Sequence, residues 1–371
     1  MNIAIRGAGH FGRYVAQQLV QRKNDVVKFY VDNNIDICGS VIDGIQVISP
    51  EQLYNKYDKE IDVVLVAFMD SITFFNSIVT LDKKIGFIGN RVFEAKMSLS
   101  DDLLQDKNIV WNDASYLNKP ILRSLETNIV DNCNLNCKGC SHFSNLFEHG
   151  AQIPYEIFCK DLKQVTEHVF VHQFNMLGGE ALLNDKITEY IEYARKLLPY
   201  SEIQLISNGL LIPTQSDDFF KCCKENDITI SISGYKPTLQ IKDKIVDILD
   251  KYHIVYIFRE DVSEFSKNID LTGKSDKDEA VRRCHQNKCH FLRNGKIYKC
   301  PFEALGNIFF EHFGVNINFE GGTNIYDERL DWEKLIDGLY NMPVDACKYC
   351  SKEEKIVWKV EHNPVIEDWI V

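Results

Sequence analysis

The chain of 371 residues is 45% apolar, which is enough to bury two or three cores, so we expect more than one domain. Its formal charge is -12, from 42 basic and 54 acidic residues, and it has no Lys/Arg cluster dense enough to follow a phosphate backbone, which argues against nucleic acid as a partner. It has no signal-peptide apolar core and no apolar window of membrane-spanning length, so we expect a cytoplasmic protein with no membrane partner.

The N-terminus predicts a strand, a glycine turn and a helix. Residues 3–6 are apolar, Gly7, Gly9 and Gly12 form a GxGxxG turn, and a helical pattern follows, which is the context in which this motif indicates nucleotide binding. A second apolar run, VVKFYV, ends at Asp32, where an acid of such a unit meets a ribose hydroxyl. Free N–H groups at a helix start attract pyrophosphate, so the expected ligand is NAD or a nucleotide-sugar. A domain that only docks partners is the alternative.

Two further apolar runs, residues 61–68 and 83–89, alternate with helical stretches and predict a doubly wound, mostly parallel sheet over residues 1–97. The polar composition of residues 98–120 indicates a linker. Through FYVDNN and the segment GSVIDGIQVISPEQL, residues 1–95 are similar to the Rossmann-like domain that begins some bacterial sugar O-acyltransferases. In those enzymes the glycine turn faces a nucleotide-sugar.

A second α/β series fills residues 121–270. Its strands and helices alternate, which predicts a partial (β/α)6 barrel with functional residues at the carboxyl ends of the strands. The expected strands are 122–130, 172–179, 202–209, 228–234 and 253–260, and the expected helices are 155–169, 187–198, a segment around 219–223, and 241–252. Residues 271–371 have short strands and five of the twelve cysteines, and they indicate a small cysteine-bound domain.

Three cysteines, Cys133, Cys137 and Cys140, lie within eight residues behind the first of these strands. Thiolates are the ligands of iron-sulfur clusters and of structural zinc, and in a reducing compartment clustered cysteines indicate metal or redox chemistry. Three thiolates on a cluster of four irons leave one iron open to bind and activate another molecule. Buried structural thiols, or a zinc site whose fourth ligand lies elsewhere, are the alternatives.

The spacing C-x3-C-x2-C in the loop after the first barrel strand resembles that of radical S-adenosylmethionine (SAM) enzymes, and the resemblance covers residues 122 to about 350. Gly178, Gly179 and Glu180, at the end of the second strand, look like the GGE motif of this family. In that motif the glycines let the backbone approach the methionine end of SAM, and the acid meets its ammonium group. Ala181 follows where family members often carry proline.

The next strand ends carry further matches. Ser207 and Asn208, in SNG at the end of the third strand, are similar to the ribose-contacting element of the family, and Ser231 or Ser233 on the next strand could face the same ligand. The resemblance implies a [4Fe-4S] cluster on the three cysteines, SAM on its open iron, and reductive cleavage to methionine and a 5'-deoxyadenosyl radical. It also implies a flavodoxin or ferredoxin-type reductant and a small-molecule substrate.

A second cysteine group comprises Cys284, Cys289, Cys300, Cys347 and Cys350. Its spacing resembles the twitch subdomain, a shortened SPASM domain of radical SAM dehydrogenases that act on alcohols, including an aminocyclitol dehydrogenase. The resemblance implies an auxiliary [4Fe-4S] cluster on Cys284, Cys300, Cys347 and Cys350, because Cys289 falls in the interval that the family leaves unliganded. Four thiolates close a cluster completely, which suits electron relay. A four-cysteine zinc knuckle is the alternative.

We therefore predict a radical SAM oxidoreductase that abstracts hydrogen from a carbinol carbon of a sugar, nucleotide-sugar or cyclitol in saccharide or natural-product biosynthesis. A dehydrogenase is favoured because oxidation gives the auxiliary cluster an electron to accept, whereas an epimerase needs a hydrogen donor, for which Cys289 is available. Arg259 and Tyr235, beside strand ends, are the candidate catalytic residues. Modification of a ribosomally made peptide and a non-enzymatic iron-sulfur or zinc protein are the alternatives.

Overall fold

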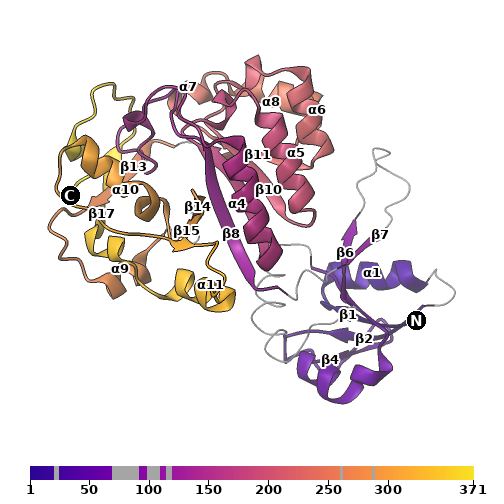
Figure 1. Cartoon of the computed structure of the whole chain (residues 1–371). Helices are drawn as coiled ribbons and strands as arrows, with labels where there is room; N and C mark the ends of the chain where they lie inside the picture. The colour runs from indigo at the N-terminus through magenta and orange to yellow at the C-terminus, as the bar shows by residue number, and fades with distance from the viewer. Residues whose placement is uncertain (21–24, 69–91, 98–108, 114–118, 260–261, 286–288) are drawn as a thin grey trace. The chain divides into compact units, whose positions relative to one another are not determined.

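The computed structural model describes residues 1–20, 25–68, 92–97, 109–113, 119–259, 262–285 and 289–371. The chain divides into two compact units, Met1–Lys119 and Pro120–Val371. Figure 1 colours both units along the chain, from indigo at the N-terminus to yellow at the C-terminus. Among the described helices, none has the length and apolar character that a membrane span requires.

The first unit is built on a seven-stranded sheet in the order β3-β4-β2-β1-β5-β6-β7. The neighbouring strands β4, β2, β1, β5 and β6 run parallel, and the edge strands β3 and β7 are antiparallel to their neighbours. The doubly wound, mostly parallel sheet expected here is therefore confirmed. The strands are β1 (Asn2–Arg6), β2 (Val26–Val31), β3 (Val41–Ile42), β4 (Ile45–Ile48), β5 (Val63–Val66), β6 (Val92–Met97) and β7 (Ile109–Asp113).

Helix α1 (His10–Val20) follows β1 and covers the sheet. Phe11, Val15 and Leu19 recur at helical spacing on α1 and join Ile5 of β1 in one buried core. Between β4 and β5 the chain makes three short helical turns, which are α2 (Pro50–Gln52), the π-turn η1 (Leu53–Tyr57) and the 3-10 turn η2 (Asp58–Glu60). The glycine turn before α1 therefore lies at the carboxyl end of a buried parallel strand.

The segment of residues 98–120, expected as a linker, contains strand β7, which pairs with β6 in the sheet of the first unit. The first compact unit accordingly extends to Lys119. The strand expected at residues 83–89 and the polar residues 98–108 lie outside the described residues.

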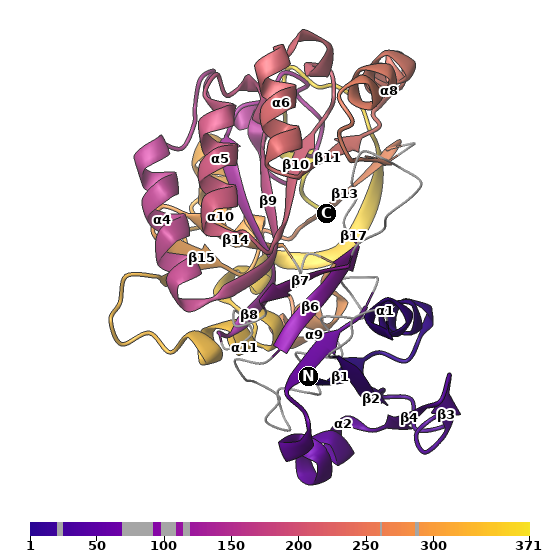
Figure 2. The same cartoon turned by 90° about the vertical axis from the view of Figure 1, so that its right-hand side faces the viewer.

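The second unit contains an eight-stranded sheet in the order β12-β11-β10-β9-β8-β14-β15-β16. Strands β8 to β12 are parallel neighbours in chain order, and helices α4, α5, α6 and α8 lie on one face of them (Figures 1 and 2). The strands are β8 (Ile121–Val130), β9 (Phe170–Gly178), β10 (Glu202–Ser207), β11 (Ile228–Ser233) and β12 (Tyr256–Arg259). The helices are α4 (Tyr155–His168), α5 (Ile187–Leu197), α6 (Asp217–Glu225), the short α7 (Lys236–Leu239) and α8 (Lys242–Lys251).

A sixth parallel strand comes from the C-terminal part of the chain. Strand β14 (His290–Arg293) pairs in parallel with β8, so it lies on the side of the sheet opposite β12. The α/β fold expected for this unit is confirmed. The hairpin strand β15 (Lys296–Tyr298) and the short β16 (Thr323–Asn324) extend the same sheet.

The C-terminal elements pack around an aromatic core. Phe291, Phe302, Phe309 and Trp369 meet in it, and Phe143, which lies just beyond the three-cysteine loop, belongs to the same buried cluster. The elements are β13 (Glu264–Ile269), α9 (Lys277–Arg283), α10 (Pro301–His312), α11 (Trp332–Asn341), η9 (Asp345–Tyr349), β17 (Cys350–Val357) and η10 (Ile366–Asp368), with β13 and β17 pairing antiparallel. The cysteine-rich segment is therefore packed directly against the loop that follows β8.

Candidate active site

The carboxyl ends of the parallel strands carry the predicted site residues. The three-cysteine loop follows β8, Gly178 ends β9, Ser207 ends β10 and Ser233 ends β11, and neighbouring parallel strands bring these ends to one edge. The loop turns through left-handed backbone at Asn136 and Gly139, with φ of 46° and 66°. Its three cysteines are thereby held in one compact turn.

One cavity of about 260 Å³ opens at this edge. Most of the residues predicted for the barrel site line it, and they are Cys133, Cys137, Cys140, Gly178, Gly179, Ser207, Asn208, Ser233, Tyr235 and Arg259. Ser231, the other serine considered on β11, is buried and lies outside this lining. The structure thus brings together residues that are more than a hundred positions apart in the sequence.

Glu180 does not line the cavity but joins the strand ends behind it. Its side chain is 0% exposed, and its carboxylate accepts hydrogen bonds from Ser207 Oγ at 2.7 Å, from the Asn208 backbone N–H at 2.8 Å and from the Leu182 backbone N–H at 3.0 Å. Burial raises the pKa of this carboxyl, and the three hydrogen bonds oppose the rise. Glu180 thus holds the SNG turn in place, and its contact with the ammonium group of SAM stays a prediction.

The two glycines of the GGE motif allow two backbones to approach closely. A Cβ on Gly178 would lie 2.0 Å from the carbonyl oxygen of Val130, and one on Gly179 would lie 2.2 Å from that of Asn132. The Gly179 N–H donates to Val130 O at 2.9 Å, which fixes the start of the cysteine loop against the end of β9. Glycine is required here by the protein backbone, independently of any ligand.

Asn208 connects the third strand end to the cysteine loop. Its side-chain amide donates to Asn134 Oδ1 at 2.7 Å and to Cys133 Sγ at 3.7 Å. Its carbonyl oxygen accepts from Thr238 Oγ1 at 2.6 Å, so the short helix α7 holds it in turn. Asn208 is thus a direct neighbour of the first cysteine.

The cavity also contains a hydrogen-bonded pair of one carboxylate and one thiol, and the sequence did not predict this pairing. Glu126, in the middle of β8, is 7% exposed and lines the cavity beside Cys289 and Arg259. Asn175 Nδ2 donates to Glu126 Oε1 at 3.0 Å, and the Cys289 thiol is hydrogen-bonded to the same carboxylate. Burial raises the pKa of Glu126, while these two hydrogen bonds and the positive charge of Arg259 oppose the rise.

Burial dominates the protonation of two of the cavity thiols, Cys133 and Cys137. It raises the pKa of Cys133 to about 12 and that of Cys137 further, because an isolated thiolate is poorly solvated there. A thiol has to give up its proton when it binds a metal, so cluster binding releases protons. Three thiols around one cavity fit the donor set of an iron-sulfur cluster with an open iron.

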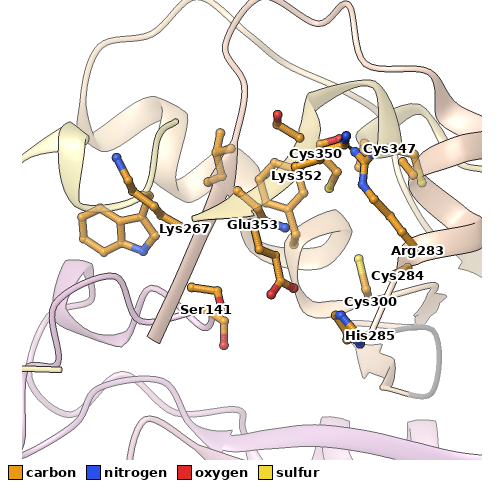
Figure 3. Close-up of a pocket in the computed structure, with 18 of the residues that line it drawn as sticks. Ser141, Lys267, Arg283, Cys284, His285, Cys300, Cys347, Cys350, Lys352 and Glu353 are labelled. Carbon is orange, nitrogen blue, oxygen red and sulfur yellow. Dashed lines mark hydrogen bonds between the residues drawn. The ribbon is translucent and has the colours of Figure 1, made fainter. Parts of the chain in front are cut away.

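Four other cysteines surround a second cavity of about 220 Å³ (Figure 3). Cys284 follows α9, Cys300 precedes α10, Cys347 lies in η9 and Cys350 begins β17, so four separate segments converge. Cys289 is absent from this lining and belongs to the barrel cavity. Four thiols around one cavity fit the donor set of a fully ligated cluster. Within the described ranges, no three His, Cys, Asp or Glu side chains are arranged around a single-ion position.

The glycine turn of the first unit has close packing and one open side. Gly7 adopts φ of 113°, and a Cβ on Gly12 would lie 1.9 Å from Gly7 O, whereas none of the described atoms comes within 4 Å of a Cβ on Gly9. Asp32 Oδ2 accepts from the Ala8 N–H at 2.8 Å, so the acid predicted to meet a ribose is bonded to the turn itself. A nucleotide at this turn stays a prediction.

The parallel sheet of Pro120–Val371 with a C-x3-C-x2-C loop at its carboxyl edge is similar to the arrangement expected of radical SAM enzymes. No family model matches the chain. It is 28% identical to GTP 3',8-cyclase of Clostridium acetobutylicum over 147 residues, which cover 33% of this chain and 45% of that protein. A second GTP 3',8-cyclase, from Thermodesulfovibrio yellowstonii, is 27% identical over 99 residues, 26% of this chain and 30% of its own. The chain thus spans less than half the length of these curated relatives.

Solved structures show more distant similarity. BtrN in complex with AdoMet and 2-DOIA matches with 14% identity and a TM-score of 0.40, covering 63% of this chain and 94% of that chain. UDP-D-quinovosamine 4-dehydrogenase from Vibrio fischeri matches with 23% identity and a TM-score of 0.24, covering 30% of this chain and 93% of that chain. The likeness of the first unit to sugar O-acyltransferases stays a prediction.

Proposed function

We propose that the protein is a radical SAM dehydrogenase that oxidises a carbinol carbon of a sugar, nucleotide-sugar or cyclitol. The observation that carries the proposal is that the three cysteines Cys133, Cys137 and Cys140 line the same cavity as Glu126. A thiol triad and a buried carboxylate in one enclosed site are what hydrogen abstraction followed by loss of a hydroxyl proton requires.

The three cysteines would hold a [4Fe-4S] cluster, and Gly178, Ser207 and the residues around them would hold SAM. When bound, cluster and SAM supply a 5'-deoxyadenosyl radical that removes a hydrogen atom from the substrate. The protein has to keep water and other hydrogen donors away from this site. The buried strand ends and the packed cysteine loop supply that enclosure.

Glu126 is the candidate base for oxidation. It is the one carboxylate among the described residues that line the cavity, and Asn175 fixes its position from the neighbouring strand. A carbinol whose carbon has lost a hydrogen atom becomes a ketone only if its hydroxyl also gives up a proton, and Glu126 is placed to accept it. Tyr235 supports this role as a donor, because burial raises the pKa of its phenol and keeps it protonated.

The four-cysteine cavity supports oxidation over a redox-neutral reaction. Its thiols would hold an auxiliary [4Fe-4S] cluster that accepts the electron released by the substrate. A flavodoxin or ferredoxin-type partner is proposed to exchange electrons with the protein. The glycine turn of the first unit is proposed to bind a nucleotide, either the nucleotide part of the substrate or NAD. The proposed auxiliary cluster and the proposed nucleotide site do not depend on each other.

Epimerisation is the second candidate, and Cys289 is the observation that favours it. Its thiol lies in the barrel cavity rather than in the four-cysteine cavity. From there it could return a hydrogen atom to a substrate radical. An epimerase would take that atom from the solvent-exchangeable thiol, whereas a dehydrogenase would release a ketone.

Anaerobic reconstitution tests the proposal. With dithionite and SAM, the protein should form methionine and 5'-deoxyadenosine, and a variant with Cys133, Cys137 and Cys140 all replaced by alanine should form neither. Nucleotide-sugars and aminocyclitols carrying deuterium on the carbinol carbon should transfer it to 5'-deoxyadenosine and yield a ketone. Absence of 5'-deoxyadenosine from protein with a full iron complement would sink the enzyme proposal, and transfer from a peptide alone would replace the substrate class.

A further inference from the structure

The last fourteen residues of the chain lie against the three-cysteine loop. The backbone N–H of Lys138 donates to Lys359 O at 2.9 Å, and the N–H of Glu361 donates to Asn136 O at 2.8 Å. These bonds flank an antiparallel bridge centred on Cys137. The C-terminal segment, residues 358–371, thus adds a short strand to the backbone of the loop.

Side chains of the C-terminal segment make further contacts with the loop. Trp369 Nε1 donates to the backbone oxygen of Cys140 at 2.8 Å. Lys138 Nζ lies 2.9 Å from Asp368 Oδ1, and this carboxylate is 2% exposed. A Cβ on Gly139 would lie 2.8 Å from Asp368 O, so the segment and the loop fit only because this position is glycine.

Trp358 makes the contact that reaches a cysteine sulfur. Its indole Nε1 donates to Cys137 Sγ at 3.2 Å. The ring is held for this bond by Tyr235, whose ring stacks on it with centroids 5.0 Å apart and an interplanar angle of 19°. The donor is therefore fixed from two sides, by the backbone bond of Trp358 N–H to Ser263 O at 2.8 Å and by an aromatic neighbour.

A hydrogen bond to a cluster ligand changes the energy of electron uptake. Reduction adds negative charge to the cluster, and part of it resides on the thiolate sulfurs. An N–H donor aimed at such a sulfur stabilises the reduced state more than the oxidised state, which raises the reduction potential. The effect is greater where the bond is shielded from water. Cys137 is buried, and its bond from Trp358 is partly buried.

We propose that Trp358 is a positioning residue that raises the reduction potential of the Cys133/Cys137/Cys140 cluster through its hydrogen bond to Cys137 Sγ. The inference rests on the proposed function, because it requires a cluster on these cysteines. Strand β17 begins at Cys350, so the segment that presents Trp358 starts at the four-cysteine cavity. The second cysteine group thus lies at the start of β17, the strand that ends directly before Trp358.

The test compares Trp358→Phe with Trp369→Phe in the full-length protein. Both substitutions remove an indole donor to the same loop, but only the first donor reaches a sulfur, and phenylalanine keeps a ring to stack on Tyr235. The readout is an EPR-monitored redox titration, and the signal whose shape changes on adding SAM identifies the triad cluster. Activity is not needed for this readout.

Trp358→Phe should lower the potential of the SAM-responsive signal. At the midpoint potential of the unaltered protein, the ratio of reduced to oxidised cluster should fall by about threefold to tenfold, the range expected for one hydrogen bond of about 1 kcal/mol. Trp369→Phe should leave the ratio unchanged. An unchanged potential in Trp358→Phe, or an equal change in Trp369→Phe, overturns the inference.

A second measurement in the unaltered protein covers the case in which Trp358→Phe loads no iron. Protein labelled with 15N in its tryptophan indoles should show a weak 15N coupling to the reduced, SAM-responsive cluster. Lack of that coupling overturns the inference while leaving the proposed function intact. Lack of any SAM-responsive signal in the unaltered protein overturns the proposed function, and the inference falls with it.

Discussion

Gly179 has no room for a side chain at the edge of the cavity. A Cβ there would lie 2.2 Å from Asn132 O, so Gly179→Ala must push β9 away from the cysteine loop. We expect the free energy of unfolding to fall by at least about 1–3 kcal/mol. The iron content should also be lower, because the start of the cysteine loop is no longer held against β9. The measurements are the thermal midpoint and iron per chain. Gly9→Ala is the control, since no described atom lies within 4 Å of its Cβ, and equal behaviour of the two variants would contradict the prediction.

Glu126 is expected to act only after hydrogen abstraction. Glu126→Gln keeps the size of the side chain and an oxygen for Asn175 but cannot accept a proton at neutral pH. With a compound that the unaltered protein oxidises, ketone formation should fall about 100-fold to 10,000-fold, while cleavage of SAM without substrate persists. Cys289→Ser is the matched variant from the same pair, and it should leave oxidation in place. Full activity of Glu126→Gln would exclude it as the base.

His290 links stability to pH. It is 0% exposed, its Nδ1 lies 3.0 Å from Lys299 O, and burial lowers its pKa from 6.5 to about 4. Between pH 6.5 and about pH 4, the unfolded chain therefore binds a proton at His290 that the folded chain does not bind. The stability that neutral His290 contributes is fully present above pH 6.5 and is lost as the pH falls toward 4. At about pH 5 the loss should be about 2 kcal/mol.

The check for His290 is the thermal midpoint near neutrality and near pH 5, in the unaltered protein and in His290→Phe. Phenylalanine keeps an aromatic ring against Tyr340 and has nothing to protonate. The fall in midpoint between the two pH values should be smaller in the variant. An equal fall in both proteins would show that His290 contributes nothing to the pH dependence.

At the scale of elements, a bidentate ion pair ties the start of the cysteine loop to strand β14. Arg293 at the end of β14 donates to both oxygens of Asp131, at 2.7 and 3.0 Å, and both side chains are largely buried. Asp131→Asn leaves a buried guanidinium without its counter-charge, so we expect a loss of about 3–5 kcal/mol. Asp327→Asn, which breaks the exposed pair with Arg329, should cost about 0–1 kcal/mol. Equal midpoints for the two variants would contradict the prediction.

The order of strands β8 to β12 and of the helices between them could be predicted, because each has a local apolar periodicity. The grouping of the site residues followed from the parallel pairing of these strands. The position of β14 could not, since its pairing with β8 joins residues that are far apart in the sequence. Glu126 left only a weak signal, because it is the one acidic residue of the predicted strand LRSLETNIV but has several polar neighbours there. Trp358 left none, because nothing local indicates that it contacts Cys137.

At the scale of the whole molecule, the two compact units have separate sheets and separate cores. All cysteines of both predicted cluster sites lie in Pro120–Val371, and each site draws its ligands from segments that this unit alone packs. The first unit carries the glycine turn, and none of its described residues lines either cysteine cavity. Cluster binding is therefore expected to depend on the second unit only.

A fragment of residues 120–371 should consequently fold and bind iron as the full chain does. We expect about eight irons per chain in both, because two clusters of four irons are proposed. Alanine at Cys133, Cys137 and Cys140 should leave about four irons in either protein, and alanine at Cys284 and Cys300 should remove the other half. Iron and acid-labile sulfide, measured after anaerobic reconstitution, provide the check, with zinc assayed alongside. The proposal of two clusters would be contradicted by zinc in place of iron. It would also be contradicted if the full-length protein bound about four irons and the triad variant bound the same number. A fragment that loads no iron beside a fully loaded full chain would contradict the independence of the second unit.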